Sequence, residues 1–305
     1  MVAISCHKVR REFRDTIALD DVTLTIDDNQ IFGLLGPNGS GKTTLLNQIQ
    51  GLDAPTSGDV EVLGLDPLRD HDQLVSRLGS QHQESTSIPR LTVRETLTLY
   101  ASFYPEARDV DGLIDDLSLT EKADSRLEKL SGGQRQRVFI ALALVHNPEL
   151  LLFDELTSAL DPNIKRSIWE ILKNLRTEGR TILLTTHSME EAQELCDRVA
   201  IMDSGRILAE GSPAELIARH APGASLRVNS AISLSEEDLA GIVGVETVTR
   251  DGEQWVVSGR GDFASAVISE LTAAGDSLSG LRIDEPSLED VFLTLTGRDI
   301  GEETK

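Results

Sequence analysis

Short apolar runs alternate with amphipathic stretches along residues 1–220 of the chain. The runs at 31–35, 150–153 and 181–186 predict strands that are buried on both faces. At the N-terminus, residues 2–5 and the alternating segment 22–26 predict further short strands. Strands that alternate with helices through short turns favour a parallel α/β sheet. The expected helices cover 42–50, most of 84–130, a long segment that begins after 131 and ends near 147, and a segment that begins at 162.

The pattern changes near residues 221–223, which predicts a first domain at 1–221 and a smaller domain at 222–305. The second domain has the element order strand, helix, strand, strand, helix, strand, which is the order of a ferredoxin-like α+β fold. Asp251-Gly252 is typical of a hairpin turn between two of these strands. The elements are expected at 226 onward, 236–242, 245–249, 254–258, 262–274 and 281–283, followed by a last helix at 286–295.

A glycine-rich segment joins the apolar run at 31–35 to the helix expected at 42–50. Residues 36–43 match the phosphate-loop pattern G-x-x-x-x-G-K-[ST]. Backbone N–H groups of such a loop cradle the α- and β-phosphates, while Lys42 is placed to reach the β- and γ-phosphates and Thr43 to bind Mg²⁺. A chance match in a turn is the alternative, but the strand before and the helix after favour a nucleotide site. The candidate nucleotide-binding residues are Gly36, Pro37, Asn38, Gly39, Ser40, Gly41, Lys42, Thr43 and Thr44.

Two carboxylates follow the buried run at 150–153. Asp154 is placed to hold Mg²⁺ through water, and Glu155 is placed to polarise the water that attacks the γ-phosphate. A solvated Asp-Glu turn is common and is the alternative. The phosphate loop in the same chain favours the catalytic interpretation.

A second glycine element precedes the long helix expected after residue 131. Ser131 can cap this helix, and the two glycines let backbone N–H groups come close to an anion. Packing of a glycine helix start in the core is the alternative, but adjacent glycines are unfavourable in a helix without a reason. The candidate residues are Ser131, Gly132, Gly133 and Gln134.

Charge and composition narrow the class of protein. The chain has 305 residues, 39% of them hydrophobic, and a formal net charge of −22; nucleic acid is not expected as a partner, because phosphate neutralisation needs a basic surface. Cys6 and Cys196 are far apart, which indicates a reducing compartment and no disulfide framework. The sequence has no apolar run long enough to span a membrane and no signal-peptide core, so a cytoplasmic location is expected.

Taken together, the motifs resemble the nucleotide-binding subunit of an ATP-binding-cassette (ABC) transporter over residues 1–220. They follow the order of that family: phosphate loop, glutamine loop, signature at 130–134, Asp154-Glu155, a loop at 158–161, and Thr186-His187. The resemblance implies a P-loop NTPase fold with a RecA-like core, an antiparallel β subdomain and a helical subdomain. It also implies ATP and Mg²⁺ as ligands. Two cassettes would form a head-to-tail homodimer in which the signature of one faces the phosphate loop of the other.

The same resemblance assigns roles to single residues. Phe13 falls where the family places an aromatic ring that stacks on adenine, and a plain core residue is the alternative. Gln83 matches the glutamine that joins Mg²⁺ to the transporter contact, with Gln81 as the alternative. His187 resembles the switch histidine that touches the γ-phosphate. The expected catalytic residues are therefore Glu155, His187 and Gln83, and the expected Mg²⁺ ligands are Thr43, Gln83 and Asp154.

The loop after Glu155 contains one further residue with a family role and one departure from the family pattern. Asp161 resembles the residue that contacts the opposite cassette, and it can also cap the following helix. Leu156 stands where many members of the family have proline, a departure that alters the stiffness of the turn and removes no catalytic group.

The C-terminal segment 285–297 resembles the tail of ATP-binding subunits of ABC-2-type exporters, including the daunorubicin-type antibiotic-resistance group. This implies a peripheral protein on the inner face of the cell membrane that works with an integral membrane permease in a separate chain. We expect the permease contact within residues 84–95. A non-transport ABC ATPase and an importer subunit are the alternatives, and the transported molecule stays open because the permease holds its path.

Overall fold

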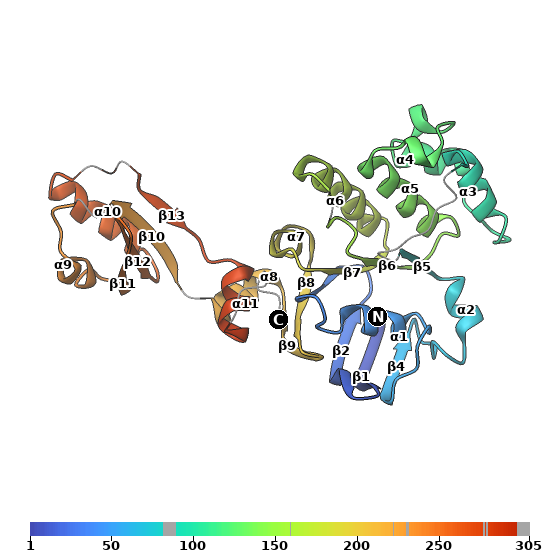
Figure 1. Cartoon of the computed structure of the whole chain (residues 1–305), viewed down its shortest axis with the longest axis horizontal. Helices are drawn as coiled ribbons and strands as arrows, with labels where there is room; N and C mark the ends of the chain where they lie inside the picture. The colour runs from blue at the N-terminus through green and yellow to red at the C-terminus, as the bar shows by residue number, and fades with distance from the viewer. Residues whose placement is uncertain are drawn as a thin grey trace. The chain divides into compact units, whose positions relative to one another are not determined.

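The structure is a computed structural model that describes residues 1–81, 90–158, 160–221, 223–229, 232–276, 278 and 280–297 (Figure 1). The chain divides into two compact units, Met1–Pro213 and a second unit that begins at Ala214. The division falls at the start of helix α8 (Pro213–His220), ahead of the boundary predicted after residue 221. Within the described residues, no helix is long and apolar enough to cross a membrane.

A six-stranded sheet forms the core of the first unit. The strand order is β5-β6-β7-β3-β8-β9, and all neighbours pair in parallel except β8 and β9. Helices α5, α6 and α7 lie on one side of the sheet, and α1 lies on the other (Figure 1). The prediction of a parallel α/β core is confirmed. The strands are β3 (Ile31–Leu35), β5 (Leu78–Gln81), β6 (Leu150–Asp154), β7 (Thr181–Thr186), β8 (Arg198–Asp203) and β9 (Arg206–Gly211).

A three-stranded antiparallel sheet, in the order β2-β1-β4, packs below α1 in Figure 1. Its strands β1 (Val2–Phe13) and β2 (Thr16–Asp27) are much longer than the segments predicted at 2–5 and 22–26, and β4 (Ser57–Val62) was not predicted. The register between β1 and β2 shifts repeatedly. Each such bulge breaks the alternation of polar and apolar positions, which explains why the sequence pattern missed the outer parts of the hairpin.

Helices α1, α5 and α6 begin where the sequence predicts, and α5 ends at Leu144, a few residues before the predicted end near 147. Helix α3 (Val93–Ala101) begins with a capping box formed by Thr92 and Glu95, and α6 (Pro162–Thr177) begins with a proline in its first turn. The described part of the segment 84–130 is mostly helical, as predicted. The remaining helices are α1 (Lys42–Ile49), α2 (His71–Val75), α4 (Val110–Asp116), η1 (Thr120–Lys122), η2 (Leu127–Lys129), α5 (Gly132–Leu144) and α7 (Met189–Leu195).

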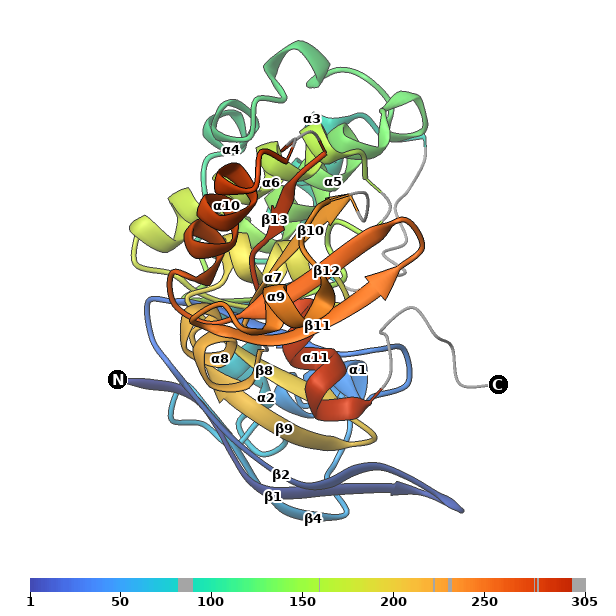
Figure 2. The ribbon, with the colours of Figure 1, turned by 90° about the vertical axis from the view of Figure 1, so that its left-hand side faces the viewer.

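The second unit contains the ferredoxin-like domain. Its antiparallel sheet has the order β11-β12-β10-β13, seen in Figure 2, and the chain order βαββαβ confirms the prediction. Side chains of α9 and α10 form one apolar core with this sheet. The final helix α11 buries Leu288, Val291 and Phe292. The elements are β10 (Ala224–Asn229), α9 (Glu236–Ala240), β11 (Val245–Asp251), β12 (Gln254–Gly259), α10 (Phe263–Ala273), β13 (Arg282–Asp284) and α11 (Leu288–Thr296).

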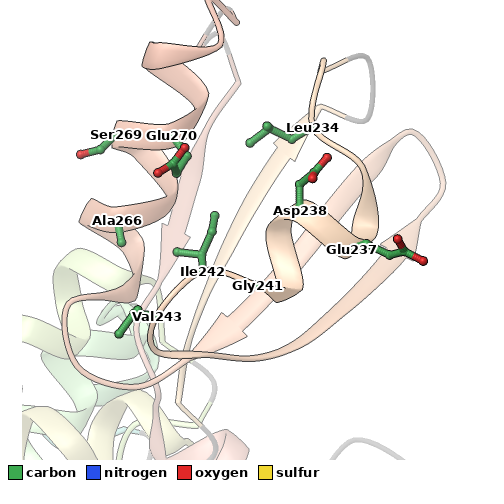
Figure 3. A pocket seen from close by; sticks show the side chains of 9 residues that line it. All are labelled: Leu234, Glu237, Asp238, Gly241, Ile242, Val243, Ala266, Ser269 and Glu270. Carbon is green, nitrogen blue, oxygen red and sulfur yellow. The ribbon is translucent and has the colours of Figure 1, made fainter.

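A hollow of about 610 Å³ lies between α9 and α10 in this domain (Figure 3). Ile242 and Glu270 point into it, and the exposed side chain of Val243 lies at its lower edge. The hollow contains no residue of the motifs that predict nucleotide binding.

Candidate functional site: a nucleotide pocket at the edge of the parallel sheet

The phosphate loop connects the carboxyl end of β3 to the first turn of α1. Gly41 is the residue before the helix; its φ of 105° and a gap of only 2.5 Å between an added Cβ and the carbonyl oxygen of Ala18 require glycine there. Because glycine has no side chain to cap the helix, the first backbone N–H groups of α1 remain available to an anion. The local backbone therefore has the form that a phosphate site needs.

Lys42 lies over this loop with only 5% of its surface exposed. Its ammonium group donates hydrogen bonds to the carbonyl oxygens of Gly36 at 2.8 Å and Pro37 at 2.9 Å. Burial lowers the pKa of Lys42, and the carboxylates of Glu155 and Asp154 act in the opposite direction. The phosphates of a nucleotide would add further negative charge beside this ammonium group.

Asp154 is the last residue of β6 and is buried. Its Oδ2 accepts a hydrogen bond from Thr43 Oγ1 at 3.1 Å, and its Oδ1 accepts one from the hydroxyl of Thr185 on the neighbouring strand β7. Hard oxygen atoms of this kind suit Mg²⁺, which commonly binds one or two carboxylates together with substrate phosphates. In the part of the chain that the structure describes, no cluster of three or more His, Cys, Asp or Glu side chains could hold a metal by itself.

Glu155 and His187 face each other across the ends of β6 and β7. Glu155 Oε1 lies 3.2 Å from His187 Nδ1. The backbone of Glu155 is left-handed, with φ of 50°, which is uncommon outside glycine and occurs often at functional sites. Its N–H group donates to Thr185 Oγ1 at 3.1 Å, so the turn is held to β7.

These residues surround one open pocket of about 420 Å³. Thr185 is the functional neighbour that sequence reasoning missed, because β7 contains three threonines and nothing in the strand itself singles out this one. The pocket is lined by Thr16, Ile17, Ala18, Asn38, Gly39, Gly41, Lys42, Thr43, Thr44 and Glu155. It thus brings the phosphate loop and the candidate base together, with Asp154 and His187 as direct neighbours.

Phe13 is 46% exposed, so the alternative that it is a core residue is wrong. It pairs across the β1–β2 hairpin with Thr16, which lines the pocket. The guanidinium group of Arg11 lies 4.4 Å from the centre of its ring, and Arg11 is held in turn by Asp53. Phe13 is therefore an exposed aromatic ring beside the pocket, supported by a cation.

The signature element begins α5 and does not line this pocket. The predicted cap is present: Ser131 Oγ accepts from the N–H of Gln134, and Gln134 Oε1 accepts from the N–H of Ser131. The structure corrects the interpretation of Gly133, for which packing was set aside. A Cβ there would lie 2.5 Å from Ile164 Cγ2 on α6, whereas a Cβ at Gly132 would meet only an ordinary contact. Gly133 is needed for packing, and Gly132 is exposed.

Two further predictions have different outcomes. Asp161 precedes α6, but its exposed side chain makes no capping hydrogen bond, so the capping role is wrong. Gln83 lies outside the described residues, and its role remains a prediction. Gln81, the alternative, ends β5, and its carboxamide oxygen accepts from Gln136 of α5 at 3.0 Å.

Comparison with known proteins agrees with this geometry. A family model described as ABC transporter matches residues 19–158. The chain is 36% identical to Nod factor export ATP-binding protein I of Rhizobium sp. (strain N33) over 309 residues, with 98% of each chain covered. It is 36% identical to the protein of the same name from Cupriavidus pinatubonensis (strain JMP 134 / LMG 1197), with 97% of this chain and 91% of the relative covered.

Solved structures show the same cassette. One is cbiO1 from Clostridium perfringens, part of the ABC transporter complex cbiONQ, with a TM-score of 0.65, 27% identity, and coverage of 72% of this chain and 91% of that one. Another is the dimeric structure of the bacterial ABC transporter cassette MJ0796, with a TM-score of 0.62, 32% identity, and coverage of 68% and 98%.

The chain belongs to the ABC transporter family. It is an ATPase of that family, and over nearly its whole length it is similar to ATP-binding proteins named for Nod factor export. The predicted family, fold class and enzyme activity are confirmed.

Proposed function

We propose that two copies of this chain bind Mg²⁺ and ATP head to tail and drive export through an integral membrane permease in a separate chain. The observation that carries the ATPase site is the convergence of Lys42, Thr43, Asp154 and Glu155 at the carboxyl edge of one parallel sheet. Loops at this edge are the usual ligand sites of open α/β sheets.

In this proposal each side chain has a defined task. The loop N–H groups and Lys42 hold the phosphates of ATP, and Thr43 and Asp154 hold Mg²⁺, which neutralises charge that develops on the phosphates. Glu155 polarises the attacking water and takes its proton. His187 orients Glu155 and reaches the γ-phosphate, and Gln83 completes the Mg²⁺ ligands.

The dimer is supported by the position of the signature element. Ser131 and Gly132 are exposed at the start of α5, and the first N–H groups of a helix have no acceptor within it. A phosphate of the ATP that is bound to a second cassette can occupy that position. The exposed Asp161 can contact the same second cassette. The solved MJ0796 cassette is dimeric, and this supports the arrangement by similarity.

A groove of about 250 Å³, none of whose lining residues lies within the predicted contact at 84–95, offers further apolar surface to the permease. Leu52, Val75 and Tyr100 line it, and Leu99 and Phe103 expose apolar surface nearby on α3 and just after it. Residues 84–89 of the predicted contact lie outside the described residues. Binding there would hold the chain on the inner face of the cell membrane. The relatives are named for Nod factor export, but the permease would select the molecule that this chain helps to transport.

The test of the ATPase site is Glu155→Gln. The amide keeps the shape of the side chain and cannot take a proton, so turnover should fall about a hundred-fold or more while ATP still binds. Steady-state phosphate release and filter binding of labelled ATP measure the two effects. The exposed variant Glu121→Gln is the control, and turnover retained in Glu155→Gln would remove Glu155 as the base.

The test of the two-chain site is Ser131→Arg. A bulky cation at the exposed start of α5 should slow hydrolysis in the dimer and leave ATP binding by the monomer unchanged, because the phosphate loop is elsewhere. Ser131→Ala removes the cap alone, at a cost of about 1 kcal/mol, and controls for helix stability. Loss of monomer binding in Ser131→Arg would contradict the head-to-tail site.

A further inference from the structure

Glu191 is a buried carboxylate that does not line the nucleotide pocket. It is only 3% exposed. Its Oε1 accepts hydrogen bonds from Thr157 Oγ1 at 2.6 Å and from the indole Nε1 of Trp169 at 3.0 Å. A buried carboxylate is stable only when hydrogen-bond donors replace the water that it has lost. The hydrogen bonds from Thr157 and Trp169 therefore make the burial of Glu191 possible.

The three residues come from three separate segments. Thr157 follows Glu155 in the loop after β6, and Trp169 belongs to α6. Glu191 lies in the first turn of α7, just beyond His187, and its own N–H donates to Ser188 Oγ at 3.2 Å. A single carboxylate oxygen therefore joins the loop of the base, the helix after it, and the helix that begins after the switch histidine.

We propose that Glu191 is a positioning residue for hydrolysis. It holds the loop of Glu155 against the loop of His187, so that Glu155 Oε1 and His187 Nδ1 stay at their 3.2 Å separation. His187 is exposed, so its place depends largely on the loop that carries it. This inference rests on the proposed roles of Glu155 and His187.

The expected consequence is kinetic. A displacement of about 1 Å between reacting groups lowers a rate by up to about a hundred-fold, even when the displaced residue touches no substrate. ATP is held mainly by the phosphate loop, which Glu191 does not contact. Loosening the Glu191 contacts should therefore lower kcat and leave the affinity for ATP unchanged.

The test uses matched variants of Thr157. Thr157→Val keeps the shape and removes the hydroxyl donor, and Thr157→Ser keeps the donor. We expect kcat to fall about ten-fold or more in Thr157→Val with KM and the Kd for ATP unchanged, and to recover in Thr157→Ser. In a His187→Ala background, Thr157→Val should cause little further loss, because the contact acts through that histidine.

A second donor keeps the test decisive. Trp169→Phe removes the indole N–H, and it should reproduce the fall in kcat even where Thr157→Val fails to fold. Wild-type kcat in both Thr157→Val and Trp169→Phe would overturn the positioning role. So would equal losses in Thr157→Val and Thr157→Ser, or a parallel rise in KM. Failure of the proposed function itself is seen separately, as turnover retained in Glu155→Gln.

Discussion

At the nucleotide site, the sequence motifs predict the positions of their own residues but not the side chains that hydrogen-bond to them. Lys42, Thr43 and Asp154 lie where the phosphate-loop pattern and the acidic strand end require. Thr185 was not predicted, although it donates to Asp154 and accepts from the N–H of Glu155. Its importance arises from the parallel pairing of β6 with β7, which sets Asp154 opposite Thr185. No local pattern records that pairing.

His146 is a buried histidine that follows helix α5. Its Nε2 lies 3.1 Å from the carbonyl oxygen of Leu78, which can only accept, and its ring stacks on Tyr104 at 4.4 Å. Burial lowers the pKa of His146, the carbonyl of Leu78 opposes this, and the charge of Arg180 adds to the lowering.

The unfolded chain therefore binds the proton more readily than the folded one. Stability that is present above the ordinary histidine pKa of about 6.5 is lost as the pH falls through the lowered pKa of the folded state. We expect His146→Gln to reduce the drop in unfolding free energy between about pH 7.5 and about pH 5.5, as measured by urea titration. Identical drops in the wild-type protein and in His146→Gln would contradict the assignment.

At the level of elements, the long helices and buried strands were predictable because the apolar and polar residues within each segment follow the pattern of that element. The β1–β2 hairpin was not, because its register shifts interrupt the alternation. The approach of α5 to α6 was also unpredictable, since it depends on the space between two helices. It appears at Gly133, where the side chain of Ile164 occupies the position that a Cβ would need.

This contact predicts opposite behaviour for two adjacent glycines. Gly133→Ala should lower the unfolding free energy by about 1–3 kcal/mol, because the β-branched Ile164 cannot move away easily. Gly132→Ala, whose Cβ would lie 3.5 Å from Leu160, should change it by less than about 0.5 kcal/mol. Chemical denaturation measures both. Ile164→Ala should rescue Gly133→Ala, and a failure to rescue would place the strain elsewhere.

At the scale of the whole molecule, the chain combines an ABC cassette with a ferredoxin-like domain and a formal net charge of −22. Two such copies repel each other over distances comparable to the Debye length. The proposed dimer must overcome this repulsion through contacts to shared ATP.

Dimer formation by Glu155→Gln with Mg²⁺ and ATP should therefore strengthen as salt is raised from about 0.01 M to about 0.15 M, where the Debye length shortens from about 30 Å to about 8 Å. Light scattering after gel filtration measures the dimer fraction. The double variant Lys42→Ala, Glu155→Gln should stay monomeric at every salt concentration. A dimer that weakens with salt would indicate attraction between complementary charges instead.

The sequence by itself determined the nucleotide chemistry of this protein and the local elements that have a clear periodic pattern. The phosphate loop, the acidic strand end, the signature cap and the βαββαβ order are contiguous patterns, because the groups that define each one lie within a few residues or within one period. Tertiary structure alone decided which distant groups meet: Thr185 with Asp154, Ile164 with Gly133, and Thr157 and Trp169 with Glu191. These contacts depend on strand register and helix packing, which are set by the summed burial of the whole core and leave no local trace.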